Sequence, residues 1–355
     1  MTRPLPLNLG LTLSVLALAA CGENSAPTQP ETTGPPSSAV PSFALTSNTW
    51  TLKAAPPNGS FVTGLSAGVV PDASGESIVY TLGGRFNDPD QGCGANILTY
   101  KIGTNTWTLK GSDPRLYLFN SNGVGKIGNT LYISGGETYC AGYWHIDGRF
   151  SAYDPATNTV TAKPTPPKLT ADGVTGVIDG KLYVLPGICS GEVYPYPFYC
   201  EHEAYRRLFR YNPATNYWAT KRPAPHYHAN GAGGVINGKF YAVGGEDSLS
   251  RPVAALDRYD PATDTWKTLA PLPAAGSARG AVLQGKLFVV VETSTRRRAY
   301  AYDPATNTWT PKAAPRWYHD AIVPITWGTK RYLLAVGGIH FDPGLQSNPT
   351  EVYAP

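Results

Sequence analysis

Charged residues are scarce in this chain of 355 residues, of which Asp, Glu, Lys and Arg make up only 15%. Helical periodicity is almost absent, which argues against a helical fold. The net charge is a mild +4 and the Lys and Arg residues are scattered, so the basic stripe typical of nucleic-acid-binding proteins is missing. We therefore expect no nucleic-acid partner.

The sequence also lacks the usual signatures of catalysis. It contains no recognisable nucleophile motif, no phosphate-binding loop and no set of metal-ligating residues at a telling spacing. His226 and His228 could place both imidazoles on one side of an extended segment, but no carboxylate completes a metal site there. We therefore predict no cofactor and no bound metal. A catalytic function stays open but is not favoured.

Glycine, proline and tyrosine are abundant instead, at 38, 33 and 22 residues. This composition suits many short strands joined by tight turns.

The N-terminus is predicted to be a targeting segment. Arg3 supplies a positive charge, residues 7–18 form an apolar run too short to span a bilayer as a permanent helix, and small residues follow at a cleavage site. The string Leu18-Ala19-Ala20-Cys21 resembles the lipobox of bacterial lipoproteins, which implies that Cys21 is lipidated as the first mature residue. An ordinary secretory signal that ends beside a cysteine is the alternative.

The predicted domains are therefore a signal peptide over residues 1–20, a lipidated and flexible tether over residues 21–42, and a folded body over residues 43–355. The body would be held at a membrane of the bacterial cell envelope by its lipid alone, outside the cytoplasm. Gly22 after the cysteine favours the outer membrane in a cell with two membranes.

Four cysteines remain after Cys21, namely Cys93, Cys140, Cys189 and Cys200. An even number in an exported chain favours disulfides over metal binding, and no CxxC spacing argues otherwise. Three pairings are open. We favour Cys189 with Cys200, which would close a local loop, and Cys93 with Cys140, which would link equivalent loops of neighbouring repeats.

An eight-residue stretch recurs along the chain, and its clearest copy is YDPATNTW at residues 302–309. In each copy the Tyr precedes the Trp, or the Val that replaces it, by seven positions. A truncated copy ends at Trp50. Repetition at a period of roughly 50 residues indicates a repeat architecture that forms a single closed body. The other copies are at residues 259–266 (YDPATDTW), 211–218 (YNPATNYW), 153–160 (YDPATNTV) and 100–107 (YKIGTNTW).

Between these copies lie a small-residue strand, a tight turn, and an apolar strand that ends in a glycine pair. Asp179-Gly180 and Asn237-Gly238 are examples of the turns, and such dipeptides favour two-residue hairpins. The glycine pair occurs as Gly83-Gly84, Gly135-Gly136, Gly244-Gly245 and Gly337-Gly338, and is degraded at residues 186–187 and 290–291.

Four strands per repeat, a glycine pair, and Tyr and Trp at fixed spacing together resemble the Kelch repeat over about residues 43–355. The resemblance implies an all-β fold, a six-bladed β-propeller with four antiparallel strands per blade around a channel. The last repeat stops before any Trp, whereas Trp50 has no glycine pair before it. We therefore expect a strand near residues 49–53 to pair with a strand near residues 351–354 and so close the last blade.

The two faces of such a propeller differ. The turns between the first and second and between the third and fourth strands are short, whereas the loops between the second and third strands, and the connections between blades, are long and rich in aromatic residues and arginine. Loops on a rigid scaffold usually carry binding. We name this side the loop-rich face. Its candidate ligand-binding residues are Arg115, Tyr143, Trp144, His145, His202, His226, Tyr227, His228, Arg279, Arg297, Trp317, Tyr318 and His319. The repeat tryptophans Trp107, Trp218, Trp266 and Trp309 are assigned instead to the core between blades.

We therefore predict a monomeric binding module that docks a protein or a glycan, since aromatic rings and Arg without excess charge suit both surfaces. One alternative comes from exported Kelch propellers that are sialic-acid mutarotases, for which Glu201, Glu246 or Glu292 with Arg279 or Arg297 would be candidates. A third, less favoured interpretation is a copper-radical oxidase, because Tyr227-His228 and Tyr318-His319 resemble the Tyr-His pair of that copper site.

Overall fold

The computed structural model describes residues 45–57, 63–85, 95–140, 143–187, 190–193, 196–199, 205–338 and 350–355. For a few strand residues next to the gaps between these ranges, it describes the backbone alone. The compact unit Phe43–Pro355 contains every strand described below. The predicted signal peptide, the tether and Cys21 lie outside the described residues. So do Cys93, Cys189, Cys200 and the side chain of Cys140.

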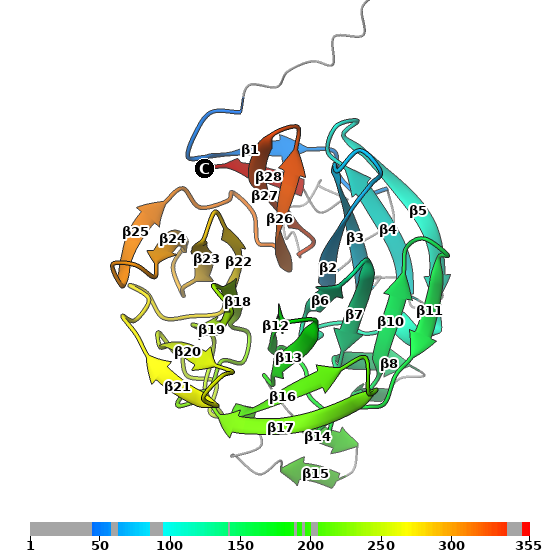
Figure 1. Cartoon of the computed structure of the whole chain (residues 1–355), viewed down its shortest axis with the longest axis vertical. Helices are drawn as coiled ribbons and strands as arrows, with labels where there is room; N and C mark the ends of the chain where they lie inside the picture. The colour runs from blue at the N-terminus through cyan, green and yellow to red at the C-terminus, as the bar shows by residue number, and fades with distance from the viewer. Residues whose placement is uncertain are drawn as a thin grey trace, which may run out of the picture. The chain divides into compact units, whose positions relative to one another are not determined.

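The strands form six four-stranded antiparallel sheets arranged as blades around a central channel (Figure 1). This confirms the predicted all-β, six-bladed propeller. From the channel outward, the blades are β2 (Thr63–Pro71), β3 (Ser77–Arg85), β4 (Ala95–Lys101), β5 (Thr106–Asp113); β6 (Val124–Ile127), β7 (Thr130–Ser134), β10 (Phe150–Asp154), β11 (Thr159–Ala162); β12 (Val174–Ile178), β13 (Lys181–Leu185), β16 (Arg207–Asn212), β17 (Tyr217–Pro223); β18 (Ala232–Ile236), β19 (Lys239–Val243), β20 (Leu256–Asp260), β21 (Thr265–Thr268); β22 (Ala278–Leu283), β23 (Lys286–Glu292), β24 (Arg297–Asp303), β25 (Thr308–Lys312); and β26 (Ala321–Trp327), β27 (Lys330–Val336), β28 (Thr350–Ala354), β1 (Thr49–Lys53). A short 3₁₀ turn, η1 (Pro114–Leu116), follows β5.

The sixth blade is closed by both ends of the propeller, as predicted. Strand β1 pairs antiparallel with β28, with Thr49 opposite Ala354 and Trp50 opposite Tyr353. All six blades therefore have four strands, and the pairing of β1 with β28 closes the ring.

The repeated Tyr is among the largest fully buried side chains of each blade. Its hydroxyl donates a hydrogen bond of 2.6–2.9 Å to an Asn or Asp side chain in the adjoining turn. That Asn or Asp has a φ between 52° and 55°, a left-handed conformation that these two residue types adopt more readily than most. The pairs are Tyr100–Asn105, Tyr153–Asn158, Tyr211–Asn216, Tyr259–Asp264, Tyr302–Asn307 and Tyr353–Asn48.

The repeated Trp joins one blade to the one before it. Each indole Nε1 donates a hydrogen bond of 2.8–2.9 Å to a backbone carbonyl at the end of the outermost strand of the preceding blade or just after it. Trp218 is buried, but the other repeat tryptophans are only half-buried, because their rings cover the outer edge of the interface between blades. The pairs are Trp50–Ala313, Trp107–Ala54, Trp218–Pro164, Trp266–Arg222 and Trp309–Ala270.

Glycines in the innermost strands let the blades converge on the channel. A Cβ added to Gly125 would lie 2.1 Å from a methyl carbon of Leu182, and one added to Gly176 would lie 2.8 Å from the ring of Phe240. In both cases the large side chain belongs to the second strand of the next blade. Close packing between blades therefore requires a residue without a side chain at these positions.

Two hairpins extend the loops between second and third strands and were not expected from the sequence. In the second blade, β8 (Glu137–Cys140) pairs with β9 (Tyr143–Ile146); in the third, β14 (Ser190–Val193) pairs with β15 (Tyr196–Tyr199). Strands β9 and β14 lie next to each other. Within the described part of the chain, no helix is long and apolar enough to cross a membrane.

Candidate functional site

The innermost strands all begin at the loop-rich face, and a run of backbone hydrogen bonds joins them there. The amide of Asn120 donates to the carbonyl of Gly64 (2.7 Å), Asp172 donates to Asn120 (2.7 Å), Asn230 donates to Asp172 (2.8 Å), and Ala278 donates to Asn230 (2.7 Å). Asn120, Asp172 and Asn230 have φ values of 52°, 53° and 55°, which turn the chain into each strand. These contacts fix the first five blades at one end of the channel.

Side chains complete this ring between the fifth, sixth and first blades. Arg279 Nε donates to the carbonyl of Asp320 (3.0 Å). The Asp320 carboxylate in turn accepts a 2.6 Å hydrogen bond from the amide of Gly338, and it also accepts from the amides of Gly64 and Leu65. Burial raises the pKa of Asp320 to about 6, while Arg279 and these amides limit the rise. Asp320 therefore links the sixth blade to the first.

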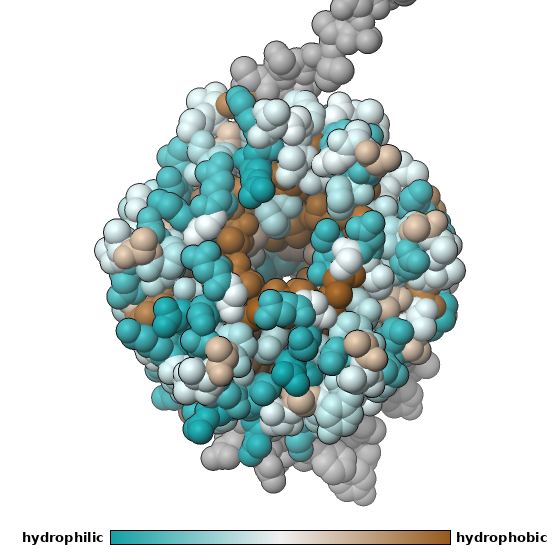
Figure 2. Space-filling model, viewed as in Figure 1, coloured by the Kyte–Doolittle hydropathy of each residue, from teal (hydrophilic) through white to brown (hydrophobic). Residues whose placement is uncertain are grey.

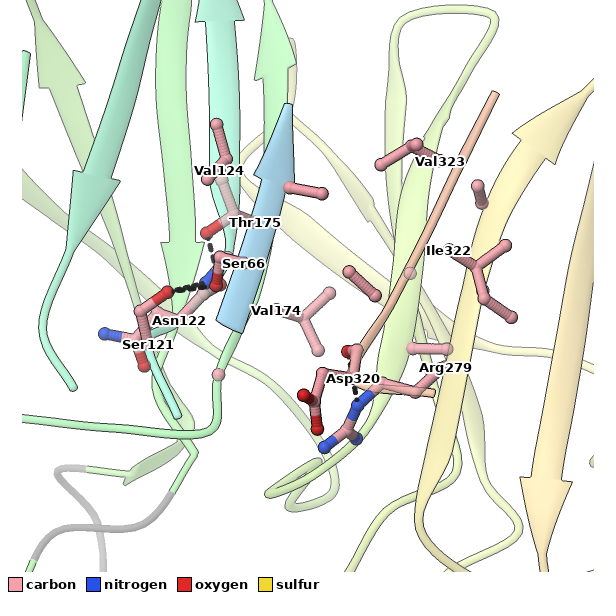
Figure 3. A pocket seen from close by; sticks show the side chains of 18 of the residues that line it. Ser66, Ser121, Asn122, Val124, Val174, Thr175, Arg279, Asp320, Ile322 and Val323 are labelled. Carbon is pink, nitrogen blue, oxygen red and sulfur yellow. Dashed lines mark hydrogen bonds between the residues drawn. The ribbon is translucent and has the colours of Figure 1, made fainter. Parts of the chain in front are cut away.

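The channel contains a cavity of about 330 Å³ whose lining is mixed: charged residues such as Arg279 and Asp320 stand at one end, and valines alternate with polar residues such as Ser66 and Thr175 along the rest. In Figure 3, Arg279 and Asp320 lie together at one end, and Val124 and Val323 lie toward the other. Figure 2 shows hydrophobic residues around the central hollow. A concave pocket of this size, in which several polar groups converge beside apolar side chains, is suited to binding a small ligand or one group of a larger ligand.

Arg279 is the cationic centre of the polar end. Its NH1 group donates to the carbonyls of Ala278 (2.9 Å) and Asn230 (3.2 Å), and its NH2 group lies 3.3 Å from the hydroxyl of Tyr318 and 3.4 Å from Oδ1 of Asn230. The guanidinium thus spans the fourth, fifth and sixth blades and is held in one orientation.

Asp172 is the most perturbed acid at this end. Only 7% of its surface is exposed, and burial raises the pKa of its carboxyl to about 8. Arg279 opposes this shift, whereas Glu137, Glu246 and Asp320 add to it. The Asp172 side chain is therefore largely protonated at neutral pH.

The sequence analysis missed Asp172, Asp320, Asn120 and Asn230. A signal was present, because each residue stands immediately before a small-residue innermost strand, as in Asp172-Gly173 and Asn230-Gly231. In one repeat alone these residues look like ordinary turn formers. Only the convergence of the blades brings them together.

We expect Asp172→Asn to stabilise the protein at pH 8 by on the order of 5 kcal/mol, because it removes the cost of ionising a carboxyl whose pKa is raised from 3.8 to about 8. Between about pH 4 and pH 8 the folded state holds a proton that the unfolded state has lost, so the wild type loses stability as pH rises through this window. The gain should disappear near pH 4. Urea unfolding across this range measures it, with Asp303→Asn as the control at a partly exposed carboxylate paired with Lys286. Equal pH dependence in wild type and Asp172→Asn would contradict this assignment.

Two predicted histidines lie beneath the loop-rich face. His228 is 1% exposed and contacts the carbonyl of Gly244 through Nδ1 (3.0 Å) and Asp257 Oδ2 through Nε2 (3.2 Å). His319 is 4% exposed and contacts Glu351 Oε2 at 2.8 Å. Asp257 and Glu351 stand in the third strands of their blades, so each histidine ties a connection between blades to its own sheet.

His226 shares the carboxylate that holds His228. Its Nδ1 lies 2.9 Å from Asp257 Oδ2, and its amide donates to the same oxygen (3.1 Å). Burial alone would raise the pKa of Asp257, but hydrogen bonds from His228, Thr268 and His226 lower it to about 2. Among the described residues, no three His, Cys, Asp or Glu side chains are grouped so as to hold a metal ion.

Two exposed or half-exposed clusters stand on the connections at the loop-rich face. In the first, the Arg206 guanidinium lies over the Tyr227 ring (5.4 Å to the centroid), and Tyr205 lies beside that ring (6.3 Å between centroids). In the second, the Arg316 guanidinium lies over the Trp317 ring at 4.9 Å. We call these the Tyr227 cluster and the Trp317 cluster.

The remaining candidates are distributed over the same face. Arg115 is exposed and forms a bidentate salt bridge with Asp113, in which Nε and NH2 each donate to one carboxylate oxygen. Arg297 pairs with Glu292 (2.9 Å) and donates to the carbonyl of Arg316, which joins it to the Trp317 cluster. Tyr143, Trp144 and His145 stand in β9, but their side chains, and His202 and Glu201 entirely, lie outside the described residues.

Glu246 and Glu292, considered for a mutarotase, are engaged within the fold. Glu246 accepts a hydrogen bond of 2.9 Å from Ser277, and Glu292 is the partner of Arg297. Burial raises the pKa of Glu292, and Arg297 opposes the rise.

Comparisons with known proteins agree with this architecture. A family model described as "Kelch motif" matches residues 228–273. The Kelch-like protein terF of Aspergillus terreus is 30% identical over 247 residues, which cover 65% of this chain and 52% of that protein, so the chain spans about half the length of the relative it matches. The solved structure of YjhT aligns with a TM-score of 0.63 at 17% identity, over 84% of this chain and 96% of that one. The chain is therefore a six-bladed β-propeller that contains a Kelch motif and is similar to Kelch-like proteins.

Proposed function

We propose that this protein is a non-catalytic binding module of the bacterial cell envelope that docks a protein or a glycan through its loop-rich face. Its lipidated Cys21 would tether the propeller at the membrane. The observation that supports docking most directly is the pair of Arg–aromatic clusters on the connections between blades. Tyr227 and Trp317 are half-exposed, and aromatic residues and Arg are enriched where proteins recognise other molecules.

The geometry of the clusters favours recognition of a preformed surface. Arg206 donates to the carbonyls of Ala224 and Pro225, so its guanidinium is fixed above Tyr227. The carbonyl of Arg316 is held by Arg297. Pre-ordered rings and guanidinium groups lose little conformational entropy on binding, and this raises the affinity that a given contact area can give.

The docking test uses the purified full-length chain on a glycan array and in pull-downs from envelope extract. We expect Trp317→Ala to weaken binding of the captured ligand at least tenfold, a typical effect for an aromatic anchor. The matched control is Tyr217→Ala, which removes a ring that is 68% exposed at the opposite end of its blade and should leave binding unchanged. Equal loss in both variants, or turnover of the captured glycan, would refute a binding function at this face.

A further inference from the structure

We propose that the polar end of the channel binds an organic cation, a primary ammonium group on an apolar stem, with Asp172 as its counter-charge. This inference rests on the proposed binding function. It names the chemical class of the group that enters the channel, whether that group belongs to a docked partner or to a free small molecule.

The first argument is the state of the Asp172 side chain. It lines the cavity, is 7% exposed, and takes part in no hydrogen bond within the described part of the chain. Asp320, by contrast, is satisfied by the amide of Gly338 and by two further amides. A carboxyl that lines a cavity and makes no hydrogen bond to the protein offers its oxygens as acceptors to a ligand with N–H donors.

The second argument is the balance of charge around Asp172. The titratable groups that face it are Arg279, Glu137, Glu246 and Asp320, so one cation stands among four acids when Asp172 is counted. Most Arg279 N–H groups are already directed at carbonyls, Asn230 and Tyr318. When Asp172 ionises, this end of the channel therefore lacks a compensating positive charge, and a cationic ligand that supplies it would gain Coulomb energy.

The third argument selects the kind of cation. No three ligating side chains among the described residues are grouped for a metal ion. The cavity of about 330 Å³ could hold roughly ten water molecules. Its lining also includes Val124, Val174, Ile322 and Val323, which would cover an alkyl stem, although Ser66 and Thr175 stand among them. A free alkylamine and a lysine side chain of a partner share this chemistry.

The test is titration of the full-length chain with n-butylamine, followed by NMR and calorimetry, with n-butanol as the neutral analogue. We expect butylammonium to bind at least tenfold more tightly than butanol at pH 8. Because the cation binds the ionised form of Asp172, its affinity should rise roughly tenfold from pH 6 to pH 7 and level off above about pH 8. Calorimetry in two buffers of different ionisation enthalpy should show release of close to one proton at pH 6–7.

Variants and analogues complete the test. Asp172→Asn should lose at least tenfold in affinity together with the pH dependence, whereas Asp303→Asn should keep both. Binding of Nα-acetyl-lysine methylamide as tight as that of butylamine would indicate a partner's side chain as the source; binding of butylamine alone would indicate a free amine. Equal affinity for butanol, no saturable amine binding at pH 8, or unchanged binding by Asp172→Asn would overturn the proposal. The amine titration needs no docking partner, and Trp317→Ala should leave amine binding unchanged. Absence of amine binding would therefore overturn the channel proposal without bearing on the docking function.

Discussion

Replacing Tyr259 with alanine should lower the free energy of unfolding by about 3–5 kcal/mol, the range seen for truncation of a buried aromatic residue. Tyr259 has no exposed surface, and its ring packs against Trp266 of the same blade (5.2 Å) and Tyr183 of the preceding blade (6.0 Å). Truncation would leave a cavity between two blades, which cannot approach further because their innermost strands are held at the channel. Chemical denaturation monitored by fluorescence and circular dichroism measures the loss.

Two further variants separate the ring of Tyr259 from its hydroxyl. Tyr259→Phe removes the 2.7 Å hydrogen bond to Asp264 but keeps the packing, so it should cost only about 1 kcal/mol. Tyr217→Ala truncates a tyrosine that is 68% exposed and should change stability by less than about 0.5 kcal/mol. If Tyr259→Ala unfolded at the same denaturant concentration as Tyr217→Ala, the repeated Tyr would not be the core residue that its burial indicates.

Asp257→Ala should be about as damaging, at about 3–5 kcal/mol, because it removes the single carboxylate that holds several buried partners. Asp257 is fully buried and contacts His226, His228 and Thr268. Without it, His228 keeps only its contact with a backbone carbonyl inside the fold. Denaturation at pH 7 measures the loss, and Asp260→Ala is the control, since its pair with Lys239 is solvent-accessible and should contribute less than about 1 kcal/mol.

The effect of Asp257 should also depend on pH in a defined direction. The pKa of its carboxyl is lowered to about 2 in the folded protein, against an ordinary value of 3.8. Its contribution is therefore fully present above about pH 4 and is lost as pH falls toward 2. The difference between wild type and Asp257→Ala should shrink across that window. A difference that stayed constant from pH 7 to pH 2 would show that the carboxylate is not held in its ionised form.

The architecture could be predicted from the sequence because its determinants recur. The Tyr–Trp spacing, the glycine pairs and the Asn-Gly turns each occur several times, so one degenerate copy, such as Val160 in place of Trp, did not obscure the count of blades. The closing strand followed from two partial repeats, since Trp50 has no glycine pair before it and the last repeat stops before any Trp. The β8–β9 and β14–β15 hairpins occur in single blades, where no second copy supported them.

The site was harder to predict because its chemistry is non-local. The positions of His228 and His319 in the chain place them at the loop-rich face. Both side chains are nevertheless buried, because they pack against the carboxylates of Asp257 and Glu351 inside the blades. Asp172 looks like a turn residue beside a glycine, and its burial and raised pKa arise only when Glu137, Glu246 and Asp320 converge on it from other blades. Arg279 was identified as a candidate, but its role as a link among three blades depends on the same convergence.

The pairing of Thr49 with Ala354 has a consequence for how the chain folds. One partner is made near the start of the propeller and the other at its end, so the sixth blade cannot form while the chain is still incomplete. Contacts of such large sequence separation form slowly, and an open ring exposes unpaired edges in the meantime. The interval between synthesis of β1 and β28 is therefore the period in which this protein is most exposed to proteolysis and aggregation.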